Sequence, residues 1–179
     1  MQKIYGLGVL LGLAGCVGGQ VALPVRWHDL GQLQVVAEAT DASLAKITLS
    51  APEWLRRNQI WYRPVYRTST ELKAYNNDQW LVGADQLLAH YLSSLRCPKP
   101  CQVHIAVQTF EQQFIQPEQA VSVLTVTATH GVANTHVSRR QFSYRETNPS
   151  PDAAGALSGF RTAAHRLQAD LTAWLAQAR

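Results

Sequence analysis

Recognised catalytic motifs are absent from this sequence of 179 residues. It contains no His-Glu-x-x-His pair, no Gly-x-Ser-x-Gly elbow, no P-loop and no Gly-x-Gly-x-x-Gly fingerprint. His28 and Asp29 would supply half of a hydrolase triad, but no activated serine or free thiol accompanies them, and a polar pair at a strand end also explains them. The motifs therefore favour a protein that is not an enzyme, although they do not reveal side chains that cluster only in the fold.

A strong charge of either sign is also missing. The chain has 16 basic and 12 acidic residues, a formal net charge of +4, which falls short of the footprint of a nucleic-acid-binding protein. Its six histidines are dispersed, with no pair at the i, i+4 spacing of a metal site on a helix. Arginine outnumbers lysine twelve to four. That excess suits contacts with acidic partners or lipid headgroups, and an ordinary solvated surface explains it too.

The N-terminus carries the most informative feature. Lys3 precedes an apolar stretch at residues 4–13, and small residues then end abruptly at Cys16. This order is typical of a secretory signal, and the stretch is too short to span a bilayer as a helix. The sequence Leu-Ala-Gly-Cys at residues 13–16 resembles a bacterial lipobox. An ordinary secretory signal followed by an incidental cysteine is the alternative.

The lipobox resemblance implies a covalent lipid on Cys16, and no other cofactor is expected. Residues 1–15 are then a lipoprotein signal peptide, residues 16–25 a lipidated flexible tether, and residues 26–179 a single domain large enough for its own core. Two or more acyl chains hold a protein firmly to a membrane. Because Val17 stands where an Asp is the usual signal for retention in the inner membrane, we expect the protein at the periplasmic face of the outer membrane.

Cys97 and Cys101 are the remaining cysteines. In an exported protein such a pair most naturally forms a disulfide, and closing so short a loop stabilises near the low end of the usual ~2–4 kcal/mol. Its expected role is to fix the turn between a helix and the next strand. A redox or metal site is the alternative, but the spacing is not Cys-x-x-Cys, two prolines stiffen the loop, and no second Cys/His pair lies nearby.

Alternating and helical patterns predict an α+β fold, with an antiparallel sheet of about five to seven strands and two amphipathic helices packed on one face. The first helix is expected to start from an N-cap at Asn77 or Asp78 and to carry an apolar stripe from Trp80 to Leu95. The second helix follows a turn at residues 148–152. The expected strands cover residues 26–38, 46–50, 59–67, 71–75, 103–110, 121–129 and 135–145.

Two parts of this prediction leave alternatives open. The apolar phase of residues 121–129 slips between Val123 and Leu124, which indicates either a β-bulge or burial on both faces. The stripe of the second helix, from Leu157 to Ala178, also fits a coiled-coil seam. Its length of about three heptads is marginal for a coiled coil, so packing on the sheet is favoured.

Residues 49–63, LSAPEWLRRNQIWYR, resemble the x-x-P-x-x-L-x-R-x-Q-I-x-x-R signature of the ABC-transporter auxiliary lipoproteins of the PqiC type. The resemblance extends over the mature chain, and it departs at Trp54, where the family usually shows Tyr, and at Arg57-Asn58, where Asp-Arg is commoner. Further matches are an aromatic-x-x-Leu-Gly element at residues 27–31, Asn-x-x-Trp at residues 77–80, Val-x-Ile-x-Val-x-x-Phe at residues 103–110, and the terminal amphipathic helix.

This resemblance implies a non-catalytic component of an intermembrane lipid transport system, in which the lipoprotein docks a periplasmic partner with mammalian-cell-entry (MCE) domains that belongs to an ABC transporter. A homo-oligomer is compatible with the sequence, and a nucleic-acid partner is not expected. Trp and Arg are the residues that interface anchors favour. Packing in the core or at the sheet edge is the alternative role for the aromatic residues. The candidate docking residues are Trp54, Arg56, Arg57, Trp61 and Arg63.

Two other functions stay open at this point. An outer-membrane assembly or adaptor lipoprotein, which plugs or stabilises a β-barrel or an envelope-polysaccharide machine, has the same anchor and the same lack of catalytic motifs. A domain that itself binds lipid needs an apolar groove between helix and sheet, and the sequence does not show whether the apolar stripes are fully covered.

Overall fold

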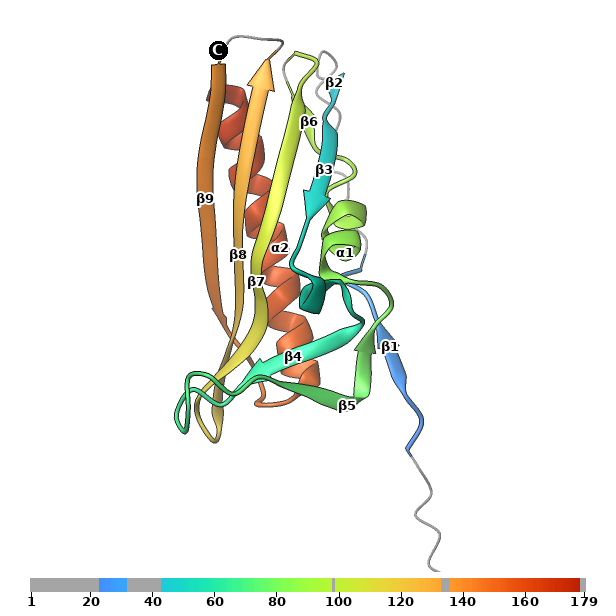
Figure 1. Cartoon of the computed structure of the whole chain (residues 1–179), viewed down its shortest axis with the longest axis vertical. Helices are drawn as coiled ribbons and strands as arrows, with labels where there is room; N and C mark the ends of the chain where they lie inside the picture. The colour runs from blue at the N-terminus through green and yellow to red at the C-terminus, as the bar shows by residue number, and fades with distance from the viewer. Residues whose placement is uncertain (1–22, 32–42, 98, 133–135, 178–179) are drawn as a thin grey trace, which may run out of the picture.

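The described part of the chain folds into a seven-stranded sheet with two helices, and the predicted α+β class is confirmed (Figure 1). The computed structural model describes residues 23–31, 43–97, 99–132 and 136–177. The strand order is β1-β5-β4-β7-β8-β9, with β3 also paired to β7, while β2 and β6 form a separate two-stranded ladder. The elements are β1 (Arg26–His28), β2 (Ser43–Leu44), β3 (Lys46–Ser50), η1 (Glu53–Arg56), β4 (Gln59–Arg63), β5 (Lys73–Trp80), α1 (Ala84–Tyr91), β6 (Arg96–Cys97), β7 (Gln102–Gln116), β8 (Gln119–Val132), β9 (His136–Thr147) and α2 (Ala153–Gln177).

Strand β7 lies inside the sheet and pairs along both of its edges. On one side it forms an antiparallel meander with β8 and β9, as the sequence predicts. On the other side β3 pairs with its first half and β4 with its second half, both parallel to β7. The sheet is therefore mixed rather than purely antiparallel, because β3 and β4 follow one another along the same edge and run in the same direction.

The first helix begins later than predicted. The expected N-cap, Asn77–Asp78, lies inside β5, and α1 begins only at Ala84. Strand pairing with β1 and β4 extends β5 as far as Trp80, whose N–H donates to the carbonyl of Asn58 at 2.7 Å. The carboxylate of Asp78 bonds side chains of β1 and so does not cap a helix.

Two other boundaries differ from the prediction. The strand expected over residues 59–67 ends at Arg63, because Pro64 has no N–H to give to a strand ladder. A turn starts there, in which the N–H of Thr68 donates to the Pro64 carbonyl at 3.0 Å. Of the extended segment expected over residues 26–38, the structure shows β1, while residues 32–42 lie outside the described part.

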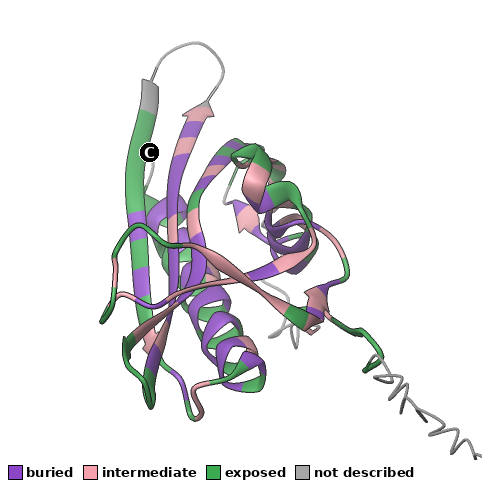
Figure 2. Ribbon diagram, turned by 60° about the horizontal axis from the view of Figure 1, so that its bottom comes forward, coloured by how far each residue is buried: buried purple, intermediate pink, exposed green. Residues whose placement is uncertain are grey.

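Both helices contribute to one continuous hydrophobic core against the sheet. Trp80, Phe110 and Phe160 are at most 1% exposed, and the ring centroid of Phe110 lies 4.2 Å from that of Phe160 and 5.4 Å from that of Trp80. Figure 2 shows the buried side of α2 turned toward the sheet and its exposed side turned away. The helix stripe, which includes the buried Leu167 and Leu171, therefore packs on the sheet and does not form a coiled-coil seam.

Strand β8 is buried on both faces, one of the two outcomes expected for it. Ser122, Val123 and Leu124 follow one another, and each is at most 5% exposed. The two register shifts of this pairing lie on the opposite strand, β7, between Val107 and Thr109 and between Phe114 and Gln116. The slip in the apolar phase of β8 therefore comes from two-sided burial. The unpaired residues of the β7–β8 ladder belong to β7.

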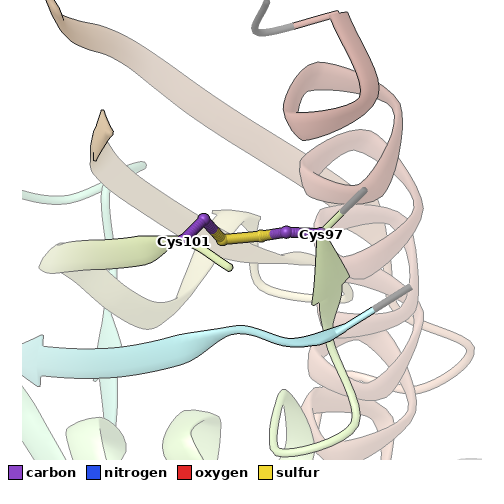
Figure 3. Close-up of a disulfide and its surroundings, with 2 residues drawn as sticks. All are labelled: Cys97 and Cys101. Atoms are coloured by element: carbon purple, nitrogen blue, oxygen red, sulfur yellow. A yellow bond between two sulfur atoms is a disulfide. The ribbon is translucent and has the colours of Figure 1, made fainter. Parts of the chain in front are cut away.

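The expected disulfide joins Cys97 of β6 to Cys101, directly before β7 (Figure 3). The two Cα atoms are 6.2 Å apart, and both residues are buried. Backbone hydrogen bonds hold the β2–β3 segment to this loop, from the Ala45 N–H to the Leu95 carbonyl (2.9 Å) and from the Lys46 N–H to the Cys101 carbonyl (3.0 Å). The bridge therefore fixes the point at which β6, β7 and the start of β3 meet.

Replacement of both cysteines, Cys97→Ala with Cys101→Ala, should lower the free energy of unfolding by about 2 kcal/mol, because the bridge restricts the unfolded chain only over a short loop. Denaturant unfolding at neutral pH measures this change. Wild-type protein held in a reducing agent is the matched control and should unfold at the midpoint of the double variant. Equal stability of the oxidised and the reduced wild type would contradict a structural role for the bridge.

Candidate functional site

Residues 52–63 lie within the stretch that resembles the family signature and comprise η1 and β4, which follow β3. We call them the docking segment, after the role expected for them from the sequence. Trp54 of η1 and Trp61 of β4 are half-buried and lie edge to face, with ring centroids 6.0 Å apart. The Trp61 Nε1–H donates to the Trp54 carbonyl at 3.0 Å, and Leu55 between them is 1% exposed. Both tryptophans pack against the core, which fits the interpretation of these aromatic residues as packing groups.

Arg56 and Arg57 occupy the exposed surface of the docking segment. Arg57 reaches the Glu53 carboxylate only at 4.0 Å, and Arg56 has no ion-pair partner among the described residues. The backbone beneath them is tightly placed, because a Cβ atom added to Gly83 would come within 2.5 Å of the Arg56 carbonyl oxygen. The glycine therefore permits the close approach of α1, and the segment presents two guanidinium groups on a fixed backbone.

Arg63, the last candidate of the segment, is engaged within the domain. Its Nε and Nη2 donate to the two carboxylate oxygens of Glu111 on β7, each at 2.8 Å, and its Nη1 donates to the Ser69 carbonyl at 3.0 Å. Such a two-pronged ion pair is among the stronger polar contacts in proteins, and the Glu111 side chain is only 3% exposed. The structure thus separates Arg63 from Arg56 and Arg57 and gives it a bracing role between β4 and β7.

A second polar cluster fastens β1 to the domain. The Asp78 carboxylate accepts a hydrogen bond from Nη2 of Arg26 and pairs with Nε2 of His28, both at 2.8 Å. Asp29 is engaged elsewhere, since its carboxylate accepts the N–H of Gly31 at 2.8 Å. The structure therefore places His28 and Asp29, the half-triad considered from the sequence, in separate interactions.

The Asp78 cluster has an electrostatic consequence. Burial alone would raise the pKa of the Asp78 carboxyl, but the hydrogen bonds from Arg26 and His28 outweigh burial and hold this pKa below its usual value. A carboxyl with a depressed native pKa stabilises the fold above its unfolded pKa, and that stabilisation is lost as the pH falls through the native pKa. The cluster therefore links the attachment of β1 to the ionised state of Asp78.

Beside β1 lies a hollow of about 250 Å³, where α2 passes the end of β5. Arg161 of α2 donates its Nε–H to the Leu30 carbonyl at 3.1 Å, which ties the chain after β1 to the helix. The walls of the hollow combine apolar side chains with a few polar groups. They are Trp27, His28, Asp29, Leu81, Leu157 and Arg161.

The described ranges contain no gathering of three His, Cys, Asp or Glu side chains that could hold a metal ion. Neither of the helices seen there has the length and apolar character needed to cross a bilayer. His104 lies between the hydroxyls of Thr48 and Ser50 at 3.2 Å each, and His130 is buried with its ring centroid 6.1 Å from that of Trp174. Hydroxyl groups therefore surround His104, whereas His130 packs against an aromatic ring.

Cys16, the predicted lipid-attachment residue, lies outside the described residues. The sequence also left the Asp78 cluster and the Arg63–Glu111 pair unidentified. The i, i+2 spacing of Arg26 and His28 is a signal for two side chains on one side of a strand. It does not reveal the acidic partner, because Asp78 follows Arg26 by 52 residues.

Solved structures share this fold over most of the chain. A crystal structure of an uncharacterised protein matches with a TM-score of 0.70 at 12% sequence identity, covering 86% of this chain and 100% of the other. The crystal structure of protein XCC0632 from Xanthomonas campestris, described as family DUF330, matches with a TM-score of 0.63 at 18% identity and covers 87% of each chain. At these identities the likeness shows the fold alone. No protein-family model and no curated protein matches the sequence.

The substitution Asp78→Asn should lower the free energy of unfolding at pH 7 by about 1–3 kcal/mol, because it removes the charge that Arg26 and His28 stabilise. The difference from wild type should hold at neutral pH and shrink as the pH falls below about 3.9, the pKa of an unfolded Asp. Urea unfolding across this pH range measures both effects. Glu118→Gln, at an exposed position, is the control, and a difference that does not change with pH would contradict the assignment.

Proposed function

We propose that this protein is a lipid-anchored lipoprotein of the bacterial envelope that serves as a non-catalytic auxiliary component of an ABC/MCE-type lipid transport system. In this proposal a lipid on Cys16 holds the protein at the periplasmic face of the outer membrane. The domain then docks the periplasmic MCE partner. The lipobox-like sequence at residues 13–16 supports the anchor, and the docking segment supports the partner.

The single observation that carries the docking half of the proposal is the fixed presentation of Arg56 and Arg57. They lie on the exposed side of the segment whose sequence resembles the family signature, above the packed pair Trp54 and Trp61. Groups held on a fixed backbone lose less conformational freedom on binding than groups on a mobile loop. Two adjacent guanidinium groups suit an acidic surface on the partner, because each can pair with a carboxylate in a planar, two-pronged geometry.

The proposal assigns no reaction to the domain. Two buried carboxylates have partners that brace the fold: Glu111 pairs with Arg63, and Asp78 pairs with Arg26 and His28. The pairs connect β4 to β7 and β1 to β5, so each stabilises a strand position. This use of polar groups is in keeping with a domain that binds a partner.

The anchor is tested on protein recovered from cell envelopes. Mass spectrometry should find Cys16 as the first residue, with a diacylglyceryl group on its sulfur and an acyl group on its α-amino nitrogen. Cys16→Ser is the control and should lack the mass of the diacylglyceryl group, because serine has no sulfur to carry it. A bare Cys16 thiol on the wild-type protein would contradict the anchor.

The docking segment is tested by capture of an MCE protein with the full-length, detergent-solubilised lipoprotein. Arg56→Ala with Arg57→Ala should weaken capture by about tenfold or more, as expected when interface anchors are truncated. Arg139→Ala with Arg145→Ala removes two exposed arginines of β9 and is the matched control. Thermal unfolding checks that both variants fold.

Three results would count against this assignment. Unchanged capture by the docking-segment variant would exclude Arg56 and Arg57 as anchors. Recovery of the lipidated protein without any MCE partner would contradict the transport proposal. Crosslinking to a β-barrel protein in place of an MCE protein would favour the assembly or adaptor function.

A further inference from the structure

Four exposed large apolar residues lie on β1, just before it, and directly after β5, the strand with which β1 pairs. Strand β1 leads back toward the N-terminus at this end of the domain (Figure 1). Leu23, Val25, Trp27 and Leu81 are 69%, 42%, 54% and 57% exposed. We call these four residues the β1 surface. Trp27 and Leu81 also line one hollow, and the Leu81 N–H donates to the carbonyl of His28 on β1 at 2.8 Å. Such a gathering of apolar groups indicates a surface that contacts something other than water.

The other exposed large apolar residues of the described chain lie elsewhere. Leu44 belongs to β2 at the opposite end of the view, while Tyr66 and Ile115 lie near the turns that follow β4 and β7 (Figure 1). These two are close in space, because the Tyr66 N–H donates to the Phe114 carbonyl at 3.3 Å. They provide a matched comparison for the β1 surface.

The chemistry of the hollow fits the boundary between a membrane and water. Trp27, Leu81 and Leu157 give it apolar walls, and the exposed Arg161 lies among them. Arg161 uses its Nε for the Leu30 carbonyl, which leaves its Nη groups without a hydrogen bond to the described residues. A tryptophan ring places apolar area and an N–H donor together at such a boundary, and a guanidinium pairs well with phosphate.

The length of the tether brings this end of the domain near the bilayer. Leu23 follows Cys16 by seven residues, and a fully extended chain of that length spans at most about 25 Å. A lipid on Cys16 therefore keeps the β1 surface within that distance of the headgroups. No other end of the domain is joined to the anchor by so short a segment.

We infer that the β1 surface rests on the phospholipid headgroup region, with Trp27 and Leu81 in the interfacial layer and Arg161 beside lipid phosphates. This inference rests on the proposed anchor at Cys16. The Asp78 cluster and the bond from Arg161 hold β1 to the domain. The contact therefore holds the whole domain in one orientation relative to the membrane.

The test uses the full-length lipidated protein in vesicles of phosphatidylethanolamine and phosphatidylglycerol, with part of the lipid brominated close to the headgroup. Bromine quenches tryptophan fluorescence only at short range, so wild-type protein should be quenched. Trp27→Phe should lose most of that quenching, whereas Trp61→Phe in the docking segment should keep it. Leu81→Glu should reduce the quenching of Trp27, and Ile115→Glu, the matched substitution at the other exposed site, should leave it unchanged.

Equal quenching of the wild type and Trp27→Phe would overturn the inference. Protection of Trp27 by a bound protein in native envelopes, without quenching in vesicles, would also overturn it and identify the surface as a protein interface. The mass of the Cys16 peptide is measured on the same samples. A protein without lipid overturns the proposed anchor, whereas a lipidated protein whose Trp27 is not quenched overturns the β1 surface alone.

Discussion

The pairing of β7 along both edges is the constraint on which the other elements depend. Its antiparallel edge carries β8 and β9, and its parallel edge carries β3 and β4 in succession. On its helix side Phe110 contacts Phe160 of α2 and Trp80 of β5. Gln112, two residues further along, accepts the Tyr75 hydroxyl at 2.5 Å and donates to the Asp152 carbonyl at 3.1 Å. One strand thus sets the positions of the sheet, of β5 and of the start of α2.

The alternation of side chains along β7 also positions the docking segment. Glu111 lies between Phe110 and Gln112 in sequence, so its side chain points to the opposite face of the sheet. There it holds Arg63 at the end of the docking segment, while Gly83 lets the start of α1 approach the carbonyl of Arg56 inside the segment. The segment is therefore fixed at two points by contacts to β7 and to the start of α1. Its exposed arginines are therefore placed by the packing of the domain, and not by a free loop.

Local sequence patterns predict this fold well where one buried face decides the structure. The strand at residues 46–50 and the stripe of α2 lie where the pattern places them. Trp80 is buried as expected, but it belongs to β5 and not to the first helix. Trp80 and the buried residues of α1 contribute to one core, so burial alone does not distinguish the strand from the helix. Asp78 has the local properties of an N-cap, and its actual partners on β1 are about 50 residues away. No short-range pattern contains that pairing, so local patterns place the start of the first helix too early in the sequence.

Local sequence likewise predicts some features of the candidate sites, whereas others arise only in the fold. The family resemblance and the residue types make the docking segment a candidate, but only the fold separates Arg63, which pairs with Glu111, from the exposed Arg56 and Arg57. The β1 surface combines residues from the N-terminal strand with Leu81, which become neighbours only when β1 pairs with β5. A covalent anchor is a local chemical property, whereas an orienting surface is a property of the folded domain. Asp78 joins the two, because its ion pairs fasten the end of the proposed tether to the domain that the tether would orient.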